Sequence, residues 1–186
     1  MKNLLLLIVI FIIGSAAACN EQSGSAVSGV ETVTTPSAKK MLKDLDGLEK
    51  KLRNAKQVTD EMPAAGELVK LSQDFFENYP EHPKTADVLF KGADVARGIG
   101  MYGKAVQLWG FVRRNYPDYP RAPDALFMQG YTFENNLRDI ENAKDYYLKF
   151  AEDHPDHPLR EQVIISLKNL GKSPEQLIKE FQKNEQ

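Results

Sequence analysis

Residues 78–90 read NYPEHPKTADVLF, and residues 115–127 read NYPDYPRAPDALF. A weaker third copy, DHPDHPLREQVI, begins at Asp153. The first prolines of the three copies, Pro80, Pro117 and Pro155, are 37 and 38 residues apart. A repeat of this length is typical of helical hairpins that stack on one another. The segment therefore predicts an all-α fold, a solenoid of stacked antiparallel helical hairpins.

Apolar residues after each copy recur at steps of three and four, which is the period of a helix and not of a strand. A stretch rich in Gly or Asn, RGIGMYG or ENNLRDIE, divides each repeat and suits a turn. Each repeat therefore predicts two helices. The apolar residues of the first repeat are Leu89, Ala93, Ala96, Ala105, Leu108, Trp109 and Val112.

The prolines predict where the helices end and begin. A residue before proline avoids helical backbone, so Tyr79, Tyr116 and His154 are expected to end helices. Pro123 suits the first turn of the next helix, because it has no amide hydrogen to donate. We expect the rings of Tyr79, Tyr116 and Tyr119 to pack across these turns and to fix their angles.

These spacings resemble the tetratricopeptide repeat family over about residues 64–158. The family places small residues where two helices approach, a large ring between hairpins and a proline at the end of the unit. The longer, proline-bounded turn is similar to that of family members in the bacterial cell envelope. The matching residues are Ala93 and Gly130, Ala105 and Ala143, Trp109 and Tyr147, and Pro117 and Pro155. Val112 and Phe150 depart from the family, which prefers Ala there.

The remaining chain divides around this core. Residues 1–18 are expected to be a signal peptide, residues 19–38 a flexible tether and residues 39–186 the repeat domain. Its units are placed at about 39–80, 84–117 and 122–155. Residues 159–183 are expected to form two helices that cover the end of the stack, the second with Ser173 and Gln176 as a capping box.

The N-terminus, MKNLLLLIVIFIIGSAAAC, has the layout of a secretory signal: a basic flank, an apolar run and small residues. SAAAC resembles the lipobox of bacterial lipoproteins, which implies a diacylglycerol on Cys19, the one cysteine of the chain. Ala16 departs from the Leu that is more usual in that motif. Asn20 is not the Asp that retains such proteins in the inner membrane of enteric bacteria. We therefore expect a lipid anchor in the outer membrane, with the domain facing the periplasm; an ordinary signal peptide remains the alternative.

The sequence offers little support for bound cofactors, metals or nucleic acid. The formal net charge is -2, so there is no electrostatic reason to expect nucleic acid. His154 and His157, flanked by acids, could bind zinc. The equivalent positions hold Tyr116 and Tyr119, however, which indicates ring packing. GKS at 171–173 lacks the earlier glycine of a phosphate loop. No metal, cofactor or catalytic residue is predicted, and the oligomeric state is left open.

The resemblance implies a groove lined by the first helix of each hairpin, which would bind a protein or peptide. The function expected is a non-catalytic adaptor or scaffold in envelope assembly or maintenance. An accessory that binds a small ligand or glycan for uptake is the alternative. A helical lyase or hydrolase would need acids such as Asp94 and Glu134 in the groove. The groove residues carried over by position are Phe90, Lys91, Asp94, Arg97, Phe127, Met128, Tyr131 and Glu134; the competing interpretation places Phe90 and Phe127 in the core.

Overall fold

The computed structural model describes residues 35–56 and 61–184. The predicted signal peptide, Cys19 and most of the predicted tether lie outside these residues. The described part is helical and contains no strand. Its elements are α1 Ala38–Asn54, α2 Met62–Asn78, α3 Thr85–Gly98, α4 Tyr102–Asn115, α5 Ala122–Thr132, the π-helix η2 Phe133–Leu137, α6 Ile140–Asp153, α7 Arg160–Asn169 and α8 Pro174–Asn184.

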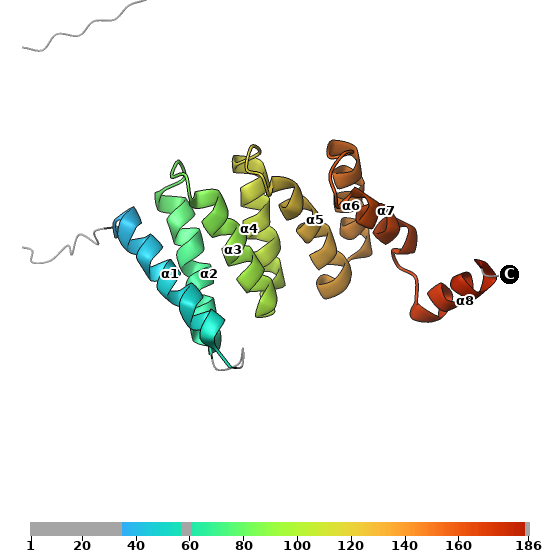
Figure 1. Cartoon of the computed structure of the whole chain (residues 1–186), viewed down its shortest axis with the longest axis horizontal. Coiled ribbons are helices and arrows are strands. Elements are labelled where there is room, and N and C mark those ends of the chain that lie inside the picture. The colour runs from blue at the N-terminus through green and yellow to red at the C-terminus, as the bar shows by residue number, and fades with distance from the viewer. Residues whose placement is uncertain (1–34, 57–60, 185–186) are drawn as a thin grey trace, which may run out of the picture. The chain divides into compact units, whose positions relative to one another are not determined.

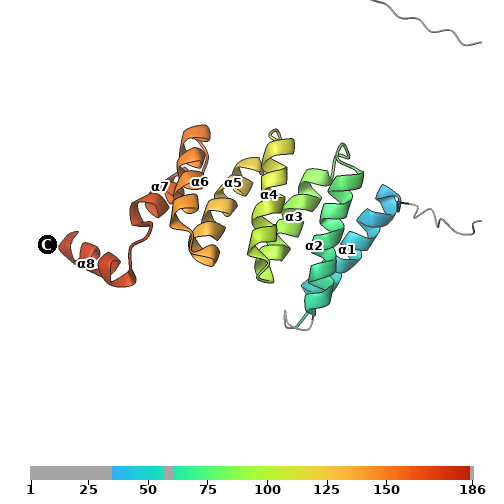
Figure 2. The ribbon, with the colours of Figure 1, turned by 180° about the vertical axis from the view of Figure 1, so that it is seen from behind.

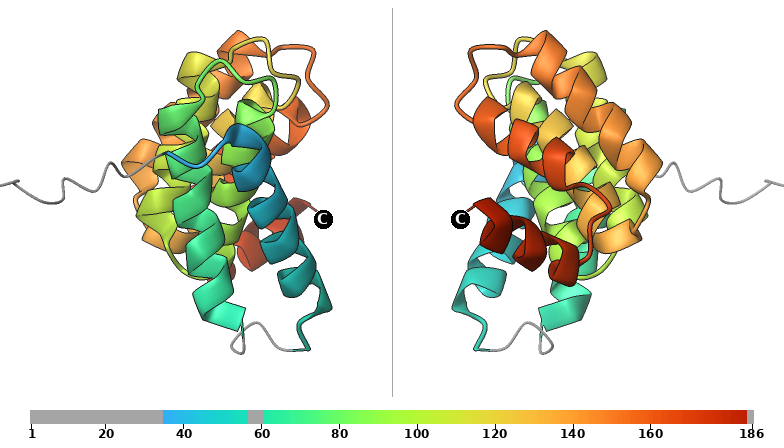
Figure 3. Two further views of the ribbon diagram at one scale, coloured as in Figure 1. Left: turned by 90° about the vertical axis from the view of Figure 1, so that its left-hand side faces the viewer. Right: turned by 90° about the vertical axis from the view of Figure 1, so that its right-hand side faces the viewer.

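Each helix from α1 to α7 packs mainly against the helices before and after it in the chain. Figures 1 and 2 show these helices following one another in a row, with the proline-bounded turns along one edge. Figure 3, seen along the row, shows α1 and α2 side by side at its beginning. The predicted all-α solenoid of antiparallel hairpins is confirmed.

The three proline-bounded turns have the same backbone hydrogen bonds. The amide of His82 donates to the carbonyl of Tyr79 at 3.1 Å, and Tyr119 and His157 repeat this bond to Tyr116 and His154. Tyr79, Tyr116 and His154 each follow the last residue of a helix. The prolines therefore end α2, α4 and α6 as predicted.

The tyrosines of these turns also join neighbouring units. Tyr79 Oη donates to the carbonyl of Pro36 and Tyr116 Oη to that of Pro80, both at 2.7 Å. The ring of Tyr119 lies 6.4 Å from that of Phe90, between centroids. The expected packing across the turns is confirmed for all three rings. The Tyr116 bond reaches back to the preceding turn and joins two successive hairpins, whereas the Tyr79 bond holds the segment before α1.

The core consists of three clusters along the row. Phe75, Trp109 and Tyr147 are its largest fully buried side chains, one in each cluster. The small residues allow close helix contacts. A Cβ atom added to Gly92 would lie 2.6 Å from the Ser72 Cβ, and one added to Gly130 would lie 2.9 Å from the Tyr147 ring.

The two ends differ from the prediction. Ser37 caps α1, its Oγ accepting from the Lys40 amide at 3.3 Å, so the fold begins before residue 39. At the other end α7 covers α6 with the buried Val163. The predicted capping box forms: Gln176 Oε1 accepts from the Ser173 amide at 2.8 Å. No extensive helix pairing within the described residues involves α8, however, so α7 alone covers the end of the stack.

Candidate protein-binding face

The first helices of the hairpins present a shared surface, which we call the first-helix face: the solvent-accessible side chains of α1, α3 and α5. Contacts between side chains join its members. Lys91 Nζ of α3 lies 3.3 Å from Glu49 Oε1 of α1. The Arg97 guanidinium of α3 lies 5.8 Å from the Tyr131 ring centroid of α5. The face therefore spans three successive units.

Lys91 and Asp94 border a pocket of about 230 Å³ between α1 and α3. Lys91 also pairs with Asp87 one turn earlier, at 3.1 Å. The pocket floor is apolar, with Leu68 and Val95, and its rim is charged. An apolar depression with charges around it is the kind of site that takes one anchoring side chain of a partner.

Asp94 is solvent-exposed but has protein around it. Burial raises the pKa of its carboxyl; the positive charges of Arg121 and Arg97 oppose this rise, and the negative charge of Asp124 adds to it. An exposed side chain would not ordinarily have a pKa raised by burial. Both observations hold when water reaches the Asp94 carboxylate from one side and protein surrounds the other. Asp94 thus lies among charges of both signs at the centre of the face.

Arg97 and Tyr131 form the contact between α3 and α5. Tyr131 is 37% exposed, which is high for an aromatic ring in a packed helix. The Arg97 Nε is buried and has no hydrogen-bond partner among the described residues. Tyrosine and arginine are also the residues enriched where binding energy concentrates.

The three remaining apolar residues of the predicted groove belong mostly to the core. Phe90 is 1% exposed and packs edge-on to Trp109, with centroids 6.3 Å apart, so its assignment to the groove surface is wrong. Phe127 is half-buried against Tyr147 and Phe150. Met128 is half-buried against the central cluster. The competing interpretation of Phe90 and Phe127 as packing residues describes them better.

Glu134 lies in η2 and faces the core. Its Oε2 accepts a hydrogen bond from Tyr147 Oη at 2.7 Å. Burial, together with this bond and the negative charge of Glu134, raises the pKa of Tyr147. No contact within the described residues joins Glu134 to Asp94. The two acids considered for a catalytic pair therefore have separate surroundings, and Glu134 is engaged in packing.

Sequence reasoning overlooked Arg121, Asp124 and Glu49. The Arg121 guanidinium lies 3.6 Å from the centroid of the Phe90 ring and covers it on the solvent side. Asp124 pairs with Arg121 at 3.4 Å. A signal for Arg121 was present, since Lys84 occupies the same place in the preceding copy of the turn. No comparable signal in the sequence indicated Glu49, because the helix that contains it lies outside the repeated sequence.

The histidines act as packing rings. Those of His154 and His157 lie 5.4 and 5.3 Å from the Phe150 ring, between centroids. Burial lowers the pKa of His154. No cluster of three or more potential metal ligands occurs in residues 35–56 and 61–184. None of the helices in these residues has the length and apolar character to span a membrane.

Comparison with known proteins agrees with this architecture. The Tetratricopeptide repeat family model matches residues 124–157, which run from the first turn of α5 to the turn after α6. No curated protein gives a significant match to the chain. All-helical stacks with such repeats typically serve as non-catalytic interaction scaffolds for other proteins. The chain is thus a stack of helical hairpins in which residues 124–157 match the Tetratricopeptide repeat family.

Proposed function

We propose that the protein is an adaptor that binds a protein or peptide through the first-helix face. The observation that carries the proposal is the line of accessible side chains across α3 and α5: Asp94, Arg97 and Tyr131. It combines an exposed ring, an arginine beside that ring and charges of both signs. Such a mixture of aromatic and charged groups suits a recognition surface.

Photo-crosslinking in living cells tests this proposal. A photoreactive amino acid at position 94 or at position 131 should give the same partner protein, identified by mass spectrometry. A matched control is position 145, because Asp145 is exposed on α6, a second helix of its hairpin. Products of equal yield from position 145 and position 94, or no protein product from positions 94 and 131, would contradict the assignment of this face.

A paired substitution tests the contribution of single side chains. Tyr131→Ala should weaken capture of the crosslinked partner by about thirtyfold or more if the ring is an anchor, since anchoring residues contribute ~2 kcal/mol or more. Tyr146→Ala is unsuitable as a control because its ring stacks on Phe133 at 5.2 Å. Leu148→Ala is better, since Leu148 is 41% exposed on α6.

We further propose that lipid on Cys19 anchors the chain in the bacterial outer membrane, where it serves envelope assembly or maintenance from the periplasmic side. The support is the sequence of residues 1–19 and the lone cysteine directly after the small residues. Two or more acyl chains hold a protein stably on a membrane. A tethered domain also has a raised local concentration beside membrane partners.

Mass spectrometry of the mature protein tests the anchor independently of the binding face. The expected N-terminal residue is a diacylglyceryl-modified Cys19, and Cys19→Ser should leave the precursor uncut and unlipidated. Fractionation on a density gradient should place the wild-type chain with the outer membrane. A mature chain that begins after Ala18 with an unmodified thiol would show an ordinary signal peptide instead.

A further inference from the structure

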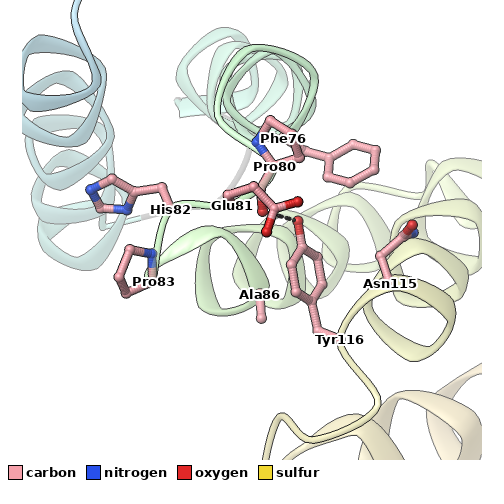
Figure 4. Close-up of a pocket in the computed structure, with 8 residues that line it drawn as sticks. All are labelled: Phe76, Pro80, Glu81, His82, Pro83, Ala86, Asn115 and Tyr116. Atoms are coloured by element: carbon pink, nitrogen blue, oxygen red, sulfur yellow. Dashed lines mark hydrogen bonds between the residues drawn. The ribbon is translucent and has the colours of Figure 1, made fainter.

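The turn between α2 and α3 forms a pocket of about 330 Å³ on the edge of the stack, and none of its lining residues belongs to α1 or α5. Figure 4 shows the rings of Phe76 and Tyr116 on one side of it, with Pro80 next to Phe76, Glu81 near the Tyr116 hydroxyl and Pro83 on the other side. The two rings meet nearly at right angles, at 78°, with centroids 6.3 Å apart. The pocket thus has aromatic walls and opens to solvent.

One end of this pocket carries acceptors. The carbonyl of Pro80 accepts a hydrogen bond from Tyr116 Oη at 2.7 Å, and the Glu81 carboxylate lies at the same end (Figure 4). Burial raises the pKa of Tyr116, and the negative charge of Glu81 adds to the rise, so the field of this carboxylate reaches the pocket. No lysine or arginine is among the eight residues that line it.

Glu81 is also unpaired. It is exposed and forms no salt bridge with any residue in the described ranges, although Lys84 is three positions along. Two exposed acids of the stack, Asp46 and Asp153, have lysine partners one turn away on their own helices. The pocket therefore combines two ring surfaces with a carboxylate that no cation of the chain neutralises.

The next junction of the stack has a different set of residues. At the places of Phe76, Glu81 and Tyr116, the following repeat has Arg113, Asp118 and His154. The hydrogen bond with Lys149 is the main reason that the pKa of Asp153 is low, and the positive charges of His154 and Arg113 contribute. The second junction thus has an arginine of its own where the first has an aromatic ring.

From this difference we propose that the pocket at the α2–α3 turn binds an arginine side chain of a partner protein. The guanidinium would lie against the rings of Phe76 and Tyr116 and pair with the Glu81 carboxylate. A planar guanidinium stacks on aromatic faces and matches a carboxylate with paired donors, which an ammonium group does not. The partner would bring to the first junction a guanidinium, the group that the chain itself has at position 113 in the second.

Binding of a short peptide tests this site. The probe is acetyl-Gly-Arg-Gly-amide, added to the full ¹⁵N-labelled chain in non-ionic detergent. The amide signals of Glu81, Ala86 and Tyr116 should shift in a saturable manner, with Kd on the order of millimolar for one such contact. The same peptide with citrulline, the neutral isostere of arginine, should bind at least about fivefold more weakly, which corresponds to one exposed ion pair.

Two variants and a control complete the experiment. Glu81→Gln should lose about fivefold in affinity for the arginine peptide and keep its melting temperature, because the side chain is exposed. Asp118→Asn, the matched change at the second junction, should leave the affinity unchanged. Phe76→Arg should abolish binding, since it places a guanidinium inside the pocket.

Three results would overturn the proposal: equal binding of the citrulline peptide, wild-type affinity in Glu81→Gln, or no saturable response to arginine. Tighter binding of tetramethylammonium than of the arginine peptide would also overturn it, because it would assign the site to small organic cations. The experiment measures binding at the α2–α3 turn alone. Its failure therefore leaves the proposed function of the first-helix face intact, and failure of the crosslinking experiment leaves this site intact.

Discussion

In the first two proline-bounded turns, the tyrosine before the first proline ends a helix and also bonds through its hydroxyl to an earlier backbone carbonyl. Tyr116 illustrates both: its amide bonds back to Val112, and its hydroxyl bonds to the Pro80 carbonyl of the preceding turn at 2.7 Å. His154 keeps the first role and lacks the hydroxyl for the second. The second turn thus has a hydroxyl bond to the preceding unit that the third turn lacks.

Tyr116→Phe should therefore lower stability while the helices remain intact. The lost bond is expected to cost about 0.5–1.5 kcal/mol, because the Pro80 carbonyl loses its donor. Thermal melting followed by circular dichroism should show a decrease of a few degrees. Tyr102→Phe is the matched control, since the Tyr102 hydroxyl has no hydrogen bond within the described residues. An equal decrease in both variants would mean that the bond contributes nothing.

Asp94 carries a negative charge that lowers the stability of the folded protein at neutral pH. Its raised folded-state pKa means that folding favours the neutral carboxyl. The neutral Asp94 carboxyl contributes to the stability of the folded protein. This contribution is complete at a pH below the pKa of the carboxyl in the unfolded chain, and it is lost as the pH rises through its pKa in the folded protein. At pH 7 the wild-type chain therefore carries an unfavourable charge, which fits a residue retained for binding.

Asp94→Asn should stabilise the protein at pH 7 and not at pH 3. The gain at pH 7 should stay below about 1 kcal/mol, because the carboxylate is exposed and solvent screens it. Melting temperatures of wild type and variant at the two pH values check this. A variant that is less stable than wild type at pH 7 would show that the arginines outweigh burial.

At the scale of elements, the repeated sequence predicts the helices and turns well because helix period and proline act locally. The repeated sequence does not predict whether the extra residue of the second repeat lengthens the loop or is taken up by the helix. The second repeat is one residue longer than the first, and the insertion is absorbed as η2, a π-helical turn at the end of α5. Gly100 and Arg138 then both take positive φ, 80° and 58°, in the turn that follows. The longer spacing was visible in the sequence, but whether the loop or the helix would absorb it depends on packing of Phe133 against Tyr146.

The candidate site was less predictable than the fold for a related reason. Position in the repeat indicates which helix a residue lies on, and Asp94, Arg97 and Tyr131 do lie on the first-helix face. It does not indicate what covers the residue. Phe90 is buried because Arg121, from the turn 31 residues later, lies over its ring. Such contacts between units depend on the angle between hairpins, which no local pattern specifies.

Contact between α2 and α3 depends on the missing side chain of Gly92. Gly92→Ala should destabilise the protein by about 1–3 kcal/mol, because the new methyl group would lie 2.6 Å from the Ser72 Cβ in a fully buried contact. Gly47→Ala is the control: Gly47 is exposed in α1 with open space around it, so the change should stabilise by up to ~1 kcal/mol through helix propensity. Urea unfolding of both variants measures the difference. Equal shifts in the same direction would refute the steric explanation.

At the scale of the whole stack, stability comes from contacts between successive helices. In such a stack, each unit is stabilised mainly by the next one, so the end units unfold most readily. The last cluster depends on α7, whose Val163 is fully buried with Tyr147 and Phe150. The α8 helix takes no part in an extensive pairing, so its amphipathic sequence does not contribute to covering the end. The two C-terminal helices should therefore differ sharply in their effect on stability.

Two truncations separate their contributions. A chain that ends at Lys172, without α8, should melt within about a degree of the full chain. A chain that ends at Pro158, without α7 as well, should lose several degrees, because each large apolar side chain uncovered costs ~1.5–3 kcal/mol. Trp109, the one tryptophan of the chain, lies in the central cluster, and its fluorescence reports that cluster separately from circular dichroism. In the shorter chain the dichroism midpoint should fall further than the fluorescence midpoint, because α6 and α5 lose their cover before the centre does. Coincident midpoints, lowered equally, would show that the stack unfolds as one cooperative unit and that the end has no separate stability.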